Sequence, residues 1–304
     1  MNELRTSNSE LQVYKRCKRN WYLEYYRKLK PLKEDFIGPL ALGSRFHLGM
    51  QHLYKPGGSY ALGLAAIFGS IEDDRDKVDA GDLPKFEKEC KLVKVMFEGY
   101  HDWLLETGAD EGLQVLAAES EIEAVLGEIA GYVVILMGKL DLEIVDSNGE
   151  QGLMDHKTCA SLNDPMLDLN EQYPTYLLIN KLNGGRGLNK VTWNMARKVL
   201  RTAAANPPFY GREEITVTDQ ALRLFYEQVT GTIRDLIETR RRLDQGESHR
   251  SVCYPTPSRQ CSYMCAFRVA CPMFMYDPHF EEYLDGEFKV GNPYERYEKQ
   301  GELE

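Results

Sequence analysis

Acidic residues and a lysine are concentrated in one short stretch of the chain, GKLDLEIVDSNGEQGLMDHKT, at residues 138–158. Apolar segments flank the turn-forming residues 146–149, so this stretch predicts a β-hairpin. Side chains alternate between the faces of a strand, so Asp155 and Lys157 project from one face and His156 from the other. A carboxylate and an ammonium group are thus directed at one point.

The register of this hairpin decides whether Asp141 joins the pair. A two-residue turn would place Asp141 opposite His156, on the wrong face from Asp155. A three-residue loop or a bulge would place Asp141 opposite Lys157 and diagonal to Asp155, and we expect this arrangement. Two converging carboxylates repel each other unless a cation bridges them, and hard oxygen ligands favour Mg²⁺ or Mn²⁺. For an isolated D-x-K triplet, the alternative is a surface hairpin with a salt bridge.

Polar residues at helical spacing flank the hairpin on both sides. Upstream, His47 begins a pattern typical of a helix. Downstream, Gln172 and Tyr176 are four residues apart, so they lie side by side on a helix surface. In chain order the motifs are H…GxxD…DxK…QxxxY. The D-x-K triplet is therefore one of several polar motifs that follow one another along the chain.

This order and spacing resemble the RecB-like branch of the PD-(D/E)XK nuclease superfamily, over about residues 7–271. The resemblance implies an α/β, restriction-endonuclease-like fold, in which a central mixed sheet is flanked by helices. It also implies an Mg²⁺- or Mn²⁺-dependent exonuclease that acts on single-stranded or end-resected DNA in recombination, repair or phage DNA metabolism. The alternative is a catalytically weak or inactive nuclease-fold module that binds DNA ends or a protein partner.

The resemblance implies a set of metal ligands and a set of catalytic residues. Asp141 and Asp155 correspond to the metal-binding carboxylates, and His47 corresponds to a further ligand. The backbone carbonyl of His156 is an additional candidate ligand. Lys157 corresponds to the catalytic lysine. Gln172 and Tyr176 correspond to the pair that positions the substrate and the active-site lysine or metal shell.

The family also has an acidic residue on the strand that precedes the G-x-x-D strand. Three candidates alternate there, at Glu119, Glu121 and Glu123. We choose Glu119 because it directly follows the most apolar part of the run. The other two are more typical of the outward face of a half-buried strand.

Cysteines gather near the C-terminal end, where four of the seven lie between Cys253 and Cys271. Three of them form the pattern C-x3-C-x5-C at Cys261, Cys265 and Cys271. The chain begins with polar residues that do not resemble a signal peptide, so we expect no disulfide framework. Bound metal is the preferred interpretation, and the spacing alone does not distinguish zinc from an iron–sulfur cluster.

The segment around Cys17 resembles the N-terminal segment of iron–sulfur-containing RecB-like nucleases, among them AddAB-type helicase-nucleases, CRISPR-adaptation nucleases and phage exonucleases. In that group a [4Fe–4S] cluster joins the two ends of the chain around the core. The resemblance implies Cys17, Cys261, Cys265 and Cys271 as ligands. Many relatives have C-x2-C where this chain has C-x3-C, so Cys253 remains an alternative to Cys261.

We expect one nuclease domain at residues 1–276, closed by the cysteine cluster. Its helical N-terminal part, at 1–112, should begin with a helix over the first thirty residues. The nuclease core should span 113–200, and a long helix with the cysteine segment should span 201–276. Residues 277–304 form an acidic tail, for which disorder and docking onto a partner both remain open.

The formal net charge of −10 argues against a strongly basic DNA-binding surface. Basic residues are nevertheless clustered, so we expect DNA to follow a local basic groove. Arg197 and Lys198 are candidate phosphate contacts, although solvated surface accounts for them equally well. The basic clusters lie at residues 15–19, 27–33, 186–201 and 240–242.

The sequence contains no apolar stretch that predicts a membrane span and no Walker-type phosphate loop. We therefore expect a cytoplasmic protein, in the host cytoplasm if a phage encodes it. Any helicase or recombination motor would come from a partner protein.

Overall fold

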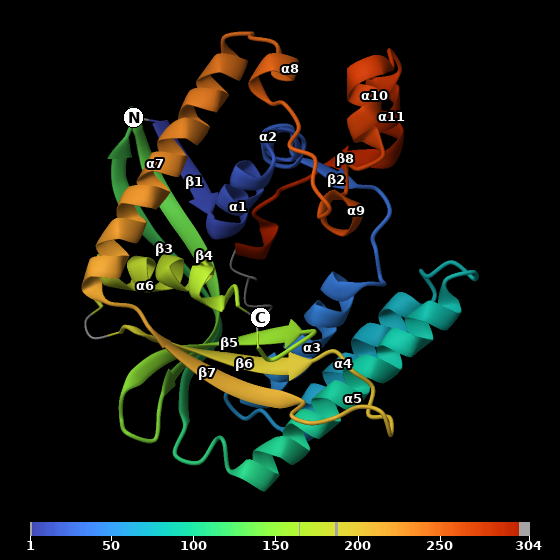
Figure 1. Ribbon diagram of the computed structural model, residues 1–304, viewed down its shortest axis with the longest axis vertical. Coiled ribbons are helices and arrows are strands. Elements are labelled where there is room, and N and C mark those ends of the chain that lie inside the picture. Colours follow the sequence, from blue (N-terminus) through green and yellow to red (C-terminus); the bar gives the residue numbers. More distant parts are fainter. Residues whose placement is uncertain (1, 164, 186–187, 298–304) are drawn as a thin grey trace, which may run out of the picture.

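The computed structural model describes residues 2–163, 165–185 and 188–297. A six-stranded sheet lies at its centre, with helices on both faces (Figure 1). The strands of this sheet are β1 (Asn2–Ser7), β3 (Gln114–Ile129), β4 (Tyr132–Val145), β5 (Gln151–Cys159), β6 (Lys190–Arg197) and β7 (Tyr210–Thr216). A separate two-stranded sheet joins β2 (Leu29–Pro31) to β8 (Phe288–Val290). Positions 186 and 187 of the expected basic cluster and positions 298–304 of the expected acidic tail lie outside the described residues.

Helices cover both faces of the sheet and form the C-terminal region. The α-helices are α1 (Asn8–Arg16), α2 (Lys18–Trp21), α3 (Pro39–Tyr54), α4 (Tyr60–Arg75), α5 (Leu83–Thr107), α6 (Gln172–Leu182), α7 (Asp219–Asp244), α8 (His249–Val252), α9 (Cys261–Met264), α10 (Ala270–Tyr276) and α11 (Phe280–Glu287). The other helical segments are the π-helix η1 (Tyr22–Tyr26) and the 3₁₀-helices η2 (Leu167–Leu169) and η3 (Glu295–Tyr297).

The central sheet is mixed. Its strand order is β1-β4-β5-β6-β7, and β3 also pairs with β4. The pairs β1–β4 and β5–β6 are parallel, whereas the others are antiparallel. The prediction of an α/β chain with a central mixed sheet is therefore confirmed.

Two apolar cores hold the layers together. On one face, α1, α6 and α7 pack against strand residues that include Leu136 and Trp193. On the other face, α3, α4 and α5 form a core around Phe46 and Phe97. Each fully buried side chain of this size stabilises the fold by about 1.5–3 kcal/mol. The sheet therefore holds a fixed position between the two helical layers.

The long helix α7 illustrates how the sequence specifies these elements. The Thr218 side chain accepts a hydrogen bond from the Ala221 N–H group and so caps the first turn. Apolar residues then recur at helical spacing, at Leu222, Phe225 and Val229, and each is buried. The predicted long helix is thus present, at Asp219–Asp244.

The N-terminus departs from the expected helix. Residues Asn2–Ser7 form β1, which pairs in parallel with residues 132–137 of β4. Ser7 then caps α1 by accepting a hydrogen bond from the Glu10 N–H group. Leu4 is the single apolar residue of β1, so the strand lacks a periodic signal and depends on a partner distant in sequence.

Much of the expected acidic tail is folded. Helix α11 packs on α10, and β8 pairs with β2 near the N-terminal end. The Tyr294 hydroxyl donates a 2.5 Å hydrogen bond to the buried carboxylate of Glu10. The C-terminal residues thereby pack against the N-terminal helices.

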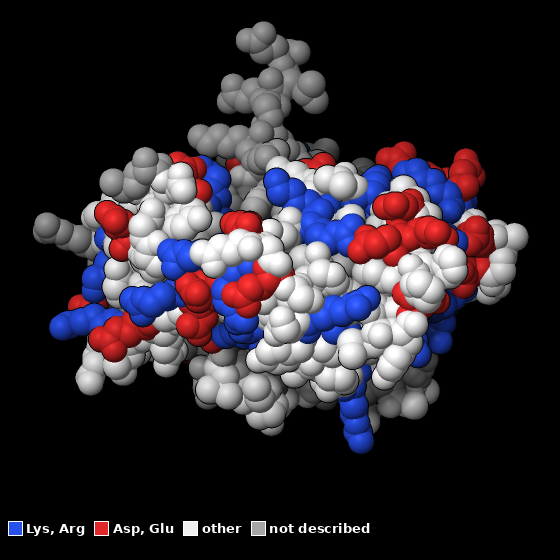
Figure 2. All heavy atoms as spheres, turned by 90° about the horizontal axis from the view of Figure 1, so that it is seen from above, with Lys and Arg blue, Asp and Glu red and all other residues white. Residues whose placement is uncertain are grey.

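None of the helices in the described part of the chain is both long and apolar enough to cross a membrane. Basic and acidic side chains are interspersed on the face that Figure 2 shows.

Candidate active site

A cleft of about 580 Å³ opens where the pairing of β4 with β5 ends. The last pair is Leu142 with Met154, directly before Asp141 and Asp155. All seven residues predicted to act through their side chains line this cleft, and they come from two helices and three strands. They are His47, Glu119, Asp141, Asp155, Lys157, Gln172 and Tyr176.

The hairpin register is set by a three-residue loop, as expected in length. The loop begins one residue earlier than expected, because the Asp146 side chain accepts hydrogen bonds from the Asn148 and Glu150 N–H groups. If this register is continued, Asp141 lies opposite Asp155. The prediction that Asp141 lies opposite Lys157 is therefore wrong by two residues. The two carboxylates still share one face of the sheet.

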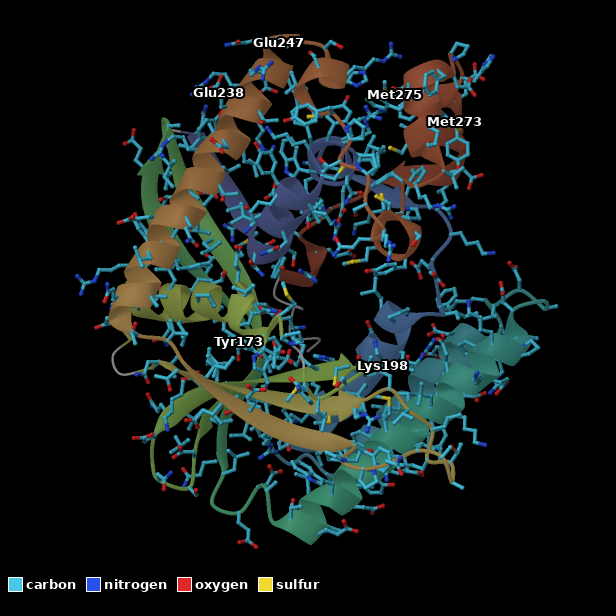
Figure 3. The ribbon with its side chains drawn as sticks, in the orientation of Figure 1. Tyr173, Lys198, Glu238, Glu247, Met273 and Met275 are labelled. Atoms are coloured by element: carbon cyan, nitrogen blue, oxygen red, sulfur yellow. The ribbon has the colours of Figure 1, made fainter. Side chains whose placement is uncertain are left out.

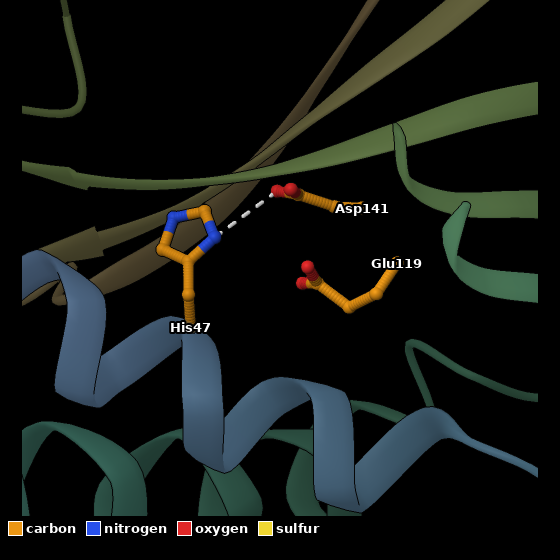
Figure 4. A group of neighbouring side chains, drawn as sticks. All are labelled: His47, Glu119 and Asp141. Carbon is orange, nitrogen blue, oxygen red and sulfur yellow. Dashed lines mark ion pairs between the residues drawn. The ribbon is translucent and has the colours of Figure 1, made fainter. Parts of the chain in front are cut away.

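A potential metal-binding group lies on one side of the cleft (Figure 4). His47 from α3, Glu119 from β3 and Asp141 from β4 each offer a ligand atom, and these atoms all lie within 4.8 Å of one another. His47 Nδ1 lies 3.3 Å from Asp141 Oδ2. The His156 backbone N–H group donates a 2.7 Å hydrogen bond to that same oxygen. Carboxylate oxygens with one imidazole nitrogen are a donor set that fits a divalent cation such as Mn²⁺.

Burial and charge shift the pKa values in this group. Burial favours protonated Asp141, but the neighbouring His47 imidazole outweighs it and holds the pKa of Asp141 below its ordinary range. Conversely, Asp141 raises the pKa of His47 against the effect of burial. Burial raises the pKa of Glu119, and burial also raises the pKa of Asp155 to about 6 although Lys157 opposes it. A bound cation would stabilise these buried carboxylates in their charged form.

A second group is joined by direct hydrogen bonds. Lys157 Nζ lies 2.7 Å from Asp155 Oδ2 and donates to Gln172 Oε1 at 2.9 Å. Gln172 Nε2 donates to Asp155 Oδ1 at 2.8 Å and to the Tyr176 hydroxyl at 2.7 Å. The Asn170 side chain accepts from the Gln172 N–H group and fixes the start of α6. The amide of Gln172 thus holds both the lysine and the carboxylate.

Gly138 allows α6 to approach β4 closely. A Cβ atom at this position would lie 2.8 Å from the Tyr176 ring, which is closer than packed atoms tolerate. The glycine of the G-x-x-D motif therefore has a packing role: it makes room for the tyrosine of the Q-x-x-x-Y motif.

Backbone geometry distinguishes the three candidate acids of β3. Glu119 has a φ of 54°, a left-handed conformation that costs a non-glycine residue roughly 1–2 kcal/mol. The pairs that bracket it place Glu119 across from Asp141. Glu121 and Glu123 line a neighbouring cavity instead. Of the three, Glu119 is the one that lines the catalytic cleft.

The His156 side chain points away from the cleft, as strand alternation predicts. Its Nδ1 atom lies 2.8 Å from Asn194 Nδ2, and its ring stacks on Tyr54 with centroids 5.5 Å apart. Burial lowers the pKa of His156 to about 3, so the ring is neutral. Its carbonyl as a metal ligand stays a prediction.

Basic residues also line the cleft, and the sequence indicated only some of them. Lys198 lies at the end of β6 (Figure 3) and lines the cleft, whereas Arg197 donates to the carbonyls of Asn206 and Pro208. Lys139 and Arg296 line the cleft and were missed. Lys139 was detectable, because it follows the motif glycine directly.

A second cavity, of about 340 Å³, contains the predicted cysteine ligands. Cys17, Cys261, Cys265 and Cys271 all line it, together with apolar residues such as Met275 on α10 (Figure 3). The cysteine pocket, as we call it, does not include Cys253, which is fully buried in the main core. Among the described residues, no three of these sulfurs lie within 4.8 Å of one another.

The thiols have few and long contacts. Cys265 Sγ lies 3.3 Å from Asn20 Oδ1, and the Thr256 N–H group lies 3.4 Å from Cys17 Sγ. Burial raises the pKa of Cys265 to about 11. In the absence of a cation, the Cys265 thiol is therefore protonated.

Comparison with known proteins gives one family. The PD-(D/E)XK nuclease superfamily matches residues 5–272. No curated protein matches the chain. The crystal structure of SSO0001 has 18% identity and a TM-score of 0.40, over 90% of this chain and 87% of that one. The crystal structure of LHK-Exo in complex with dAMP has 12% identity and a TM-score of 0.32, over 66% of this chain and 91% of that one.

Proposed function

Because the chain belongs to the PD-(D/E)XK nuclease superfamily, we propose that it is an Mg²⁺- or Mn²⁺-dependent exonuclease that hydrolyses DNA from strand ends. The observation that carries this proposal is the convergence of the metal-binding group with the hydrogen-bonded lysine in one cleft. The exonuclease assignment rests on the motif order and its resemblance to RecB-like nucleases.

In this proposal, Asp141, Asp155, Glu119 and His47 hold the divalent cation. When bound, the cation polarises the scissile phosphate and lowers the pKa of a coordinated water. The side chains around it are already oriented, because Asp141 is held by the His156 N–H group. This arrangement lowers the reorganisation required for catalysis.

Lys157 contributes positive charge at the scissile phosphate. Asp155 and Gln172 fix its ammonium group within the cleft, and the Trp193 ring lies 5.1 Å from Nζ. A fixed ammonium stabilises charge that builds on phosphate oxygens in the transition state. Tyr176 acts as a positioning residue, because its hydroxyl accepts from Gln172.

End-labelled linear single strands, linear duplexes and closed single-stranded circles test this function directly. With Mg²⁺ or Mn²⁺, linear strands should be degraded while circles survive, and EDTA should abolish degradation. Equal loss of circles would contradict exonuclease action. Binding of DNA ends without cleavage under any metal would support an inactive nuclease-fold module instead.

We also propose that the cysteine pocket holds a [4Fe–4S] cluster, in keeping with the iron–sulfur type of RecB-like nuclease. The support for this proposal is that Cys17, Cys261, Cys265 and Cys271 all line one pocket, since a [4Fe–4S] cluster takes four thiolate ligands. Cys17 follows α1, Cys261 begins α9, Cys265 directly follows α9 and Cys271 lies in α10, so the cluster would join the two ends of the chain.

Anaerobic purification followed by iron and acid-labile sulfide analysis tests this assignment. We expect about four irons and four sulfides per chain, from the cluster type. Stoichiometric zinc without iron or sulfide would overturn the cluster and leave the nuclease proposal standing.

A further inference from the structure

One cation in the catalytic cleft comes from beyond the segment that matches the nuclease family. The match ends at residue 272. Arg296 lies in η3, and it lines the same cleft as Asp141, Asp155 and Lys157. The chain therefore adds a guanidinium group from its C-terminal arm, which we define as residues 288–297.

Two contacts fix the position of this arm. Strand β8 pairs with β2 in antiparallel register, with Phe288 opposite Pro31. The Tyr294 hydroxyl donates to the buried Glu10 carboxylate, which also accepts from Trp21 Nε1 at 2.9 Å. The arm is thus attached to α1, whose first residues line the cleft.

Arg296 differs from the other cations of the cleft in its partners. Lys139 pairs with Glu119 and Lys157 pairs with Asp155. In the part of the chain that the structure describes, Arg296 forms no ion pair with a carboxylate within 4.0 Å. Its guanidinium group instead donates to Ser9 Oγ, at the start of α1, and lies 4.6 Å from the Tyr297 ring centroid. Its side chain is exposed, so its charge remains available to a ligand.

The acidic cleft needs such a charge. Asp141, Asp155 and Glu119 repel an approaching phosphate, and the whole chain carries a formal charge of −10. A guanidinium group forms two parallel hydrogen bonds with a phosphate. Lys198, on another wall of the cleft, has no carboxylate partner within 4.0 Å among the described residues and supplies a second positive charge.

We propose that Arg296 binds a backbone phosphate of the DNA strand that occupies the catalytic cleft. This proposal rests on the nuclease function proposed above. It assigns substrate affinity to the C-terminal arm and chemistry to the strands and helices of the matched segment.

Steady-state cleavage of a single-stranded oligonucleotide tests this assignment with three variants. Arg296→Gln should raise KM roughly tenfold while kcat changes by less than about threefold, because a charge-assisted hydrogen bond remote from the reacting atoms is lost. Arg296→Lys keeps the charge and should give an intermediate KM. Arg223→Gln, an exposed arginine of α7 outside the cleft, should leave both constants unchanged.

The salt dependence of binding separates a phosphate contact from a structural role. Loss of one phosphate contact lowers the slope of log Kd against log salt by about 0.7 for single strands. Arg296→Gln should show this decrease, whereas Arg296→Lys and Arg223→Gln should not. An unchanged KM and slope for Arg296→Gln, with wild-type cleavage intact, would overturn the proposal. Absence of DNA cleavage and DNA binding in the wild-type protein would refute the nuclease function and this proposal together.

Discussion

The catalytic cleft and the cysteine pocket differ in how their side chains are held. In the cleft, Lys157, Gln172, Asp155 and Tyr176 are joined by contacts of 2.7–2.9 Å. In the cysteine pocket, the sulfurs contact neighbours at 3.3–3.8 Å in an apolar surrounding. The cleft is therefore organised by its own hydrogen bonds. The cluster proposed above would join the sulfurs of the pocket to one another.

This difference predicts distinct consequences for variants at the two sites. Cleft variants should lose activity and keep the fold, whereas pocket variants should lose stability.

Lys157→Ala should lower kcat by roughly 10²–10³-fold, because it removes a fixed positive charge at the scissile phosphate. Its melting temperature should stay near that of the wild type, since Lys157 is only partly buried. Lys85→Ala, at an exposed position of α5, provides the control. A Lys157→Ala enzyme with near wild-type kcat would break the assignment of the cleft.

Cys265→Ser should abolish the broad absorption near roughly 400 nm that thiolate-bound iron gives. It should also lower the melting temperature by about 10 °C or more, because cluster binding contributes to folding free energy. Cys90→Ala serves as the control, since Cys90 is buried between helices away from the pocket. Retention of iron and of thermal stability in Cys265→Ser would show that the pocket does not bind a cluster through this thiol.

Tyr176→Phe and Tyr173→Phe form a matched pair on α6. Gln172 donates to the Tyr176 hydroxyl, so Tyr176→Phe should lower kcat by about tenfold. Tyr173 packs between α6 and the sheet, 4.0 Å from the Trp193 ring centroid (Figure 3). Its hydroxyl has no hydrogen-bond partner in the described ranges, so Tyr173→Phe should change kcat by less than about twofold. Equal effects on kcat would mean that the Gln172 hydrogen bond has no positioning role.

Glu119→Gly and Glu119→Ala separate chemistry from backbone strain. Both remove the carboxylate, so both should lose cleavage activity. Glycine adopts a positive φ without strain, whereas alanine adopts it only at an energetic cost, so the free energy of unfolding without metal should be about 1 kcal/mol greater for Glu119→Gly. Denaturant unfolding measures this difference. Equal stabilities would contradict the left-handed backbone at this residue.

Local spacing predicted that Asp155 and Lys157 share one face of a strand and that Gln172 and Tyr176 lie one helical turn apart. Their assignment to one site came from the family resemblance. His47 and Asp141 required the family resemblance, because their proximity comes from tertiary packing. The exact hairpin register was not predicted, since it depends on hydrogen bonds from the Asp146 side chain.

Long-range pairing was the main source of errors. Strand β1 contains a single apolar residue and forms because it pairs in parallel with β4. Arg296 reaches the cleft only because β8 pairs with β2 and Tyr294 bonds to Glu10. These contacts join the two ends of the chain, and no local pattern in the acidic C-terminal segment indicates them.

The most direct test of the account is metal-dependent cleavage of linear single-stranded DNA by Asp155→Asn. This substitution keeps the shape of the side chain and removes its charge, so the cation should lose a ligand and cleavage should fall at least about a thousandfold. Asp285→Asn, on the exposed surface of α11, should cleave like the wild type. Wild-type cleavage by Asp155→Asn across an Mn²⁺ titration would contradict a catalytic metal centre in this cleft.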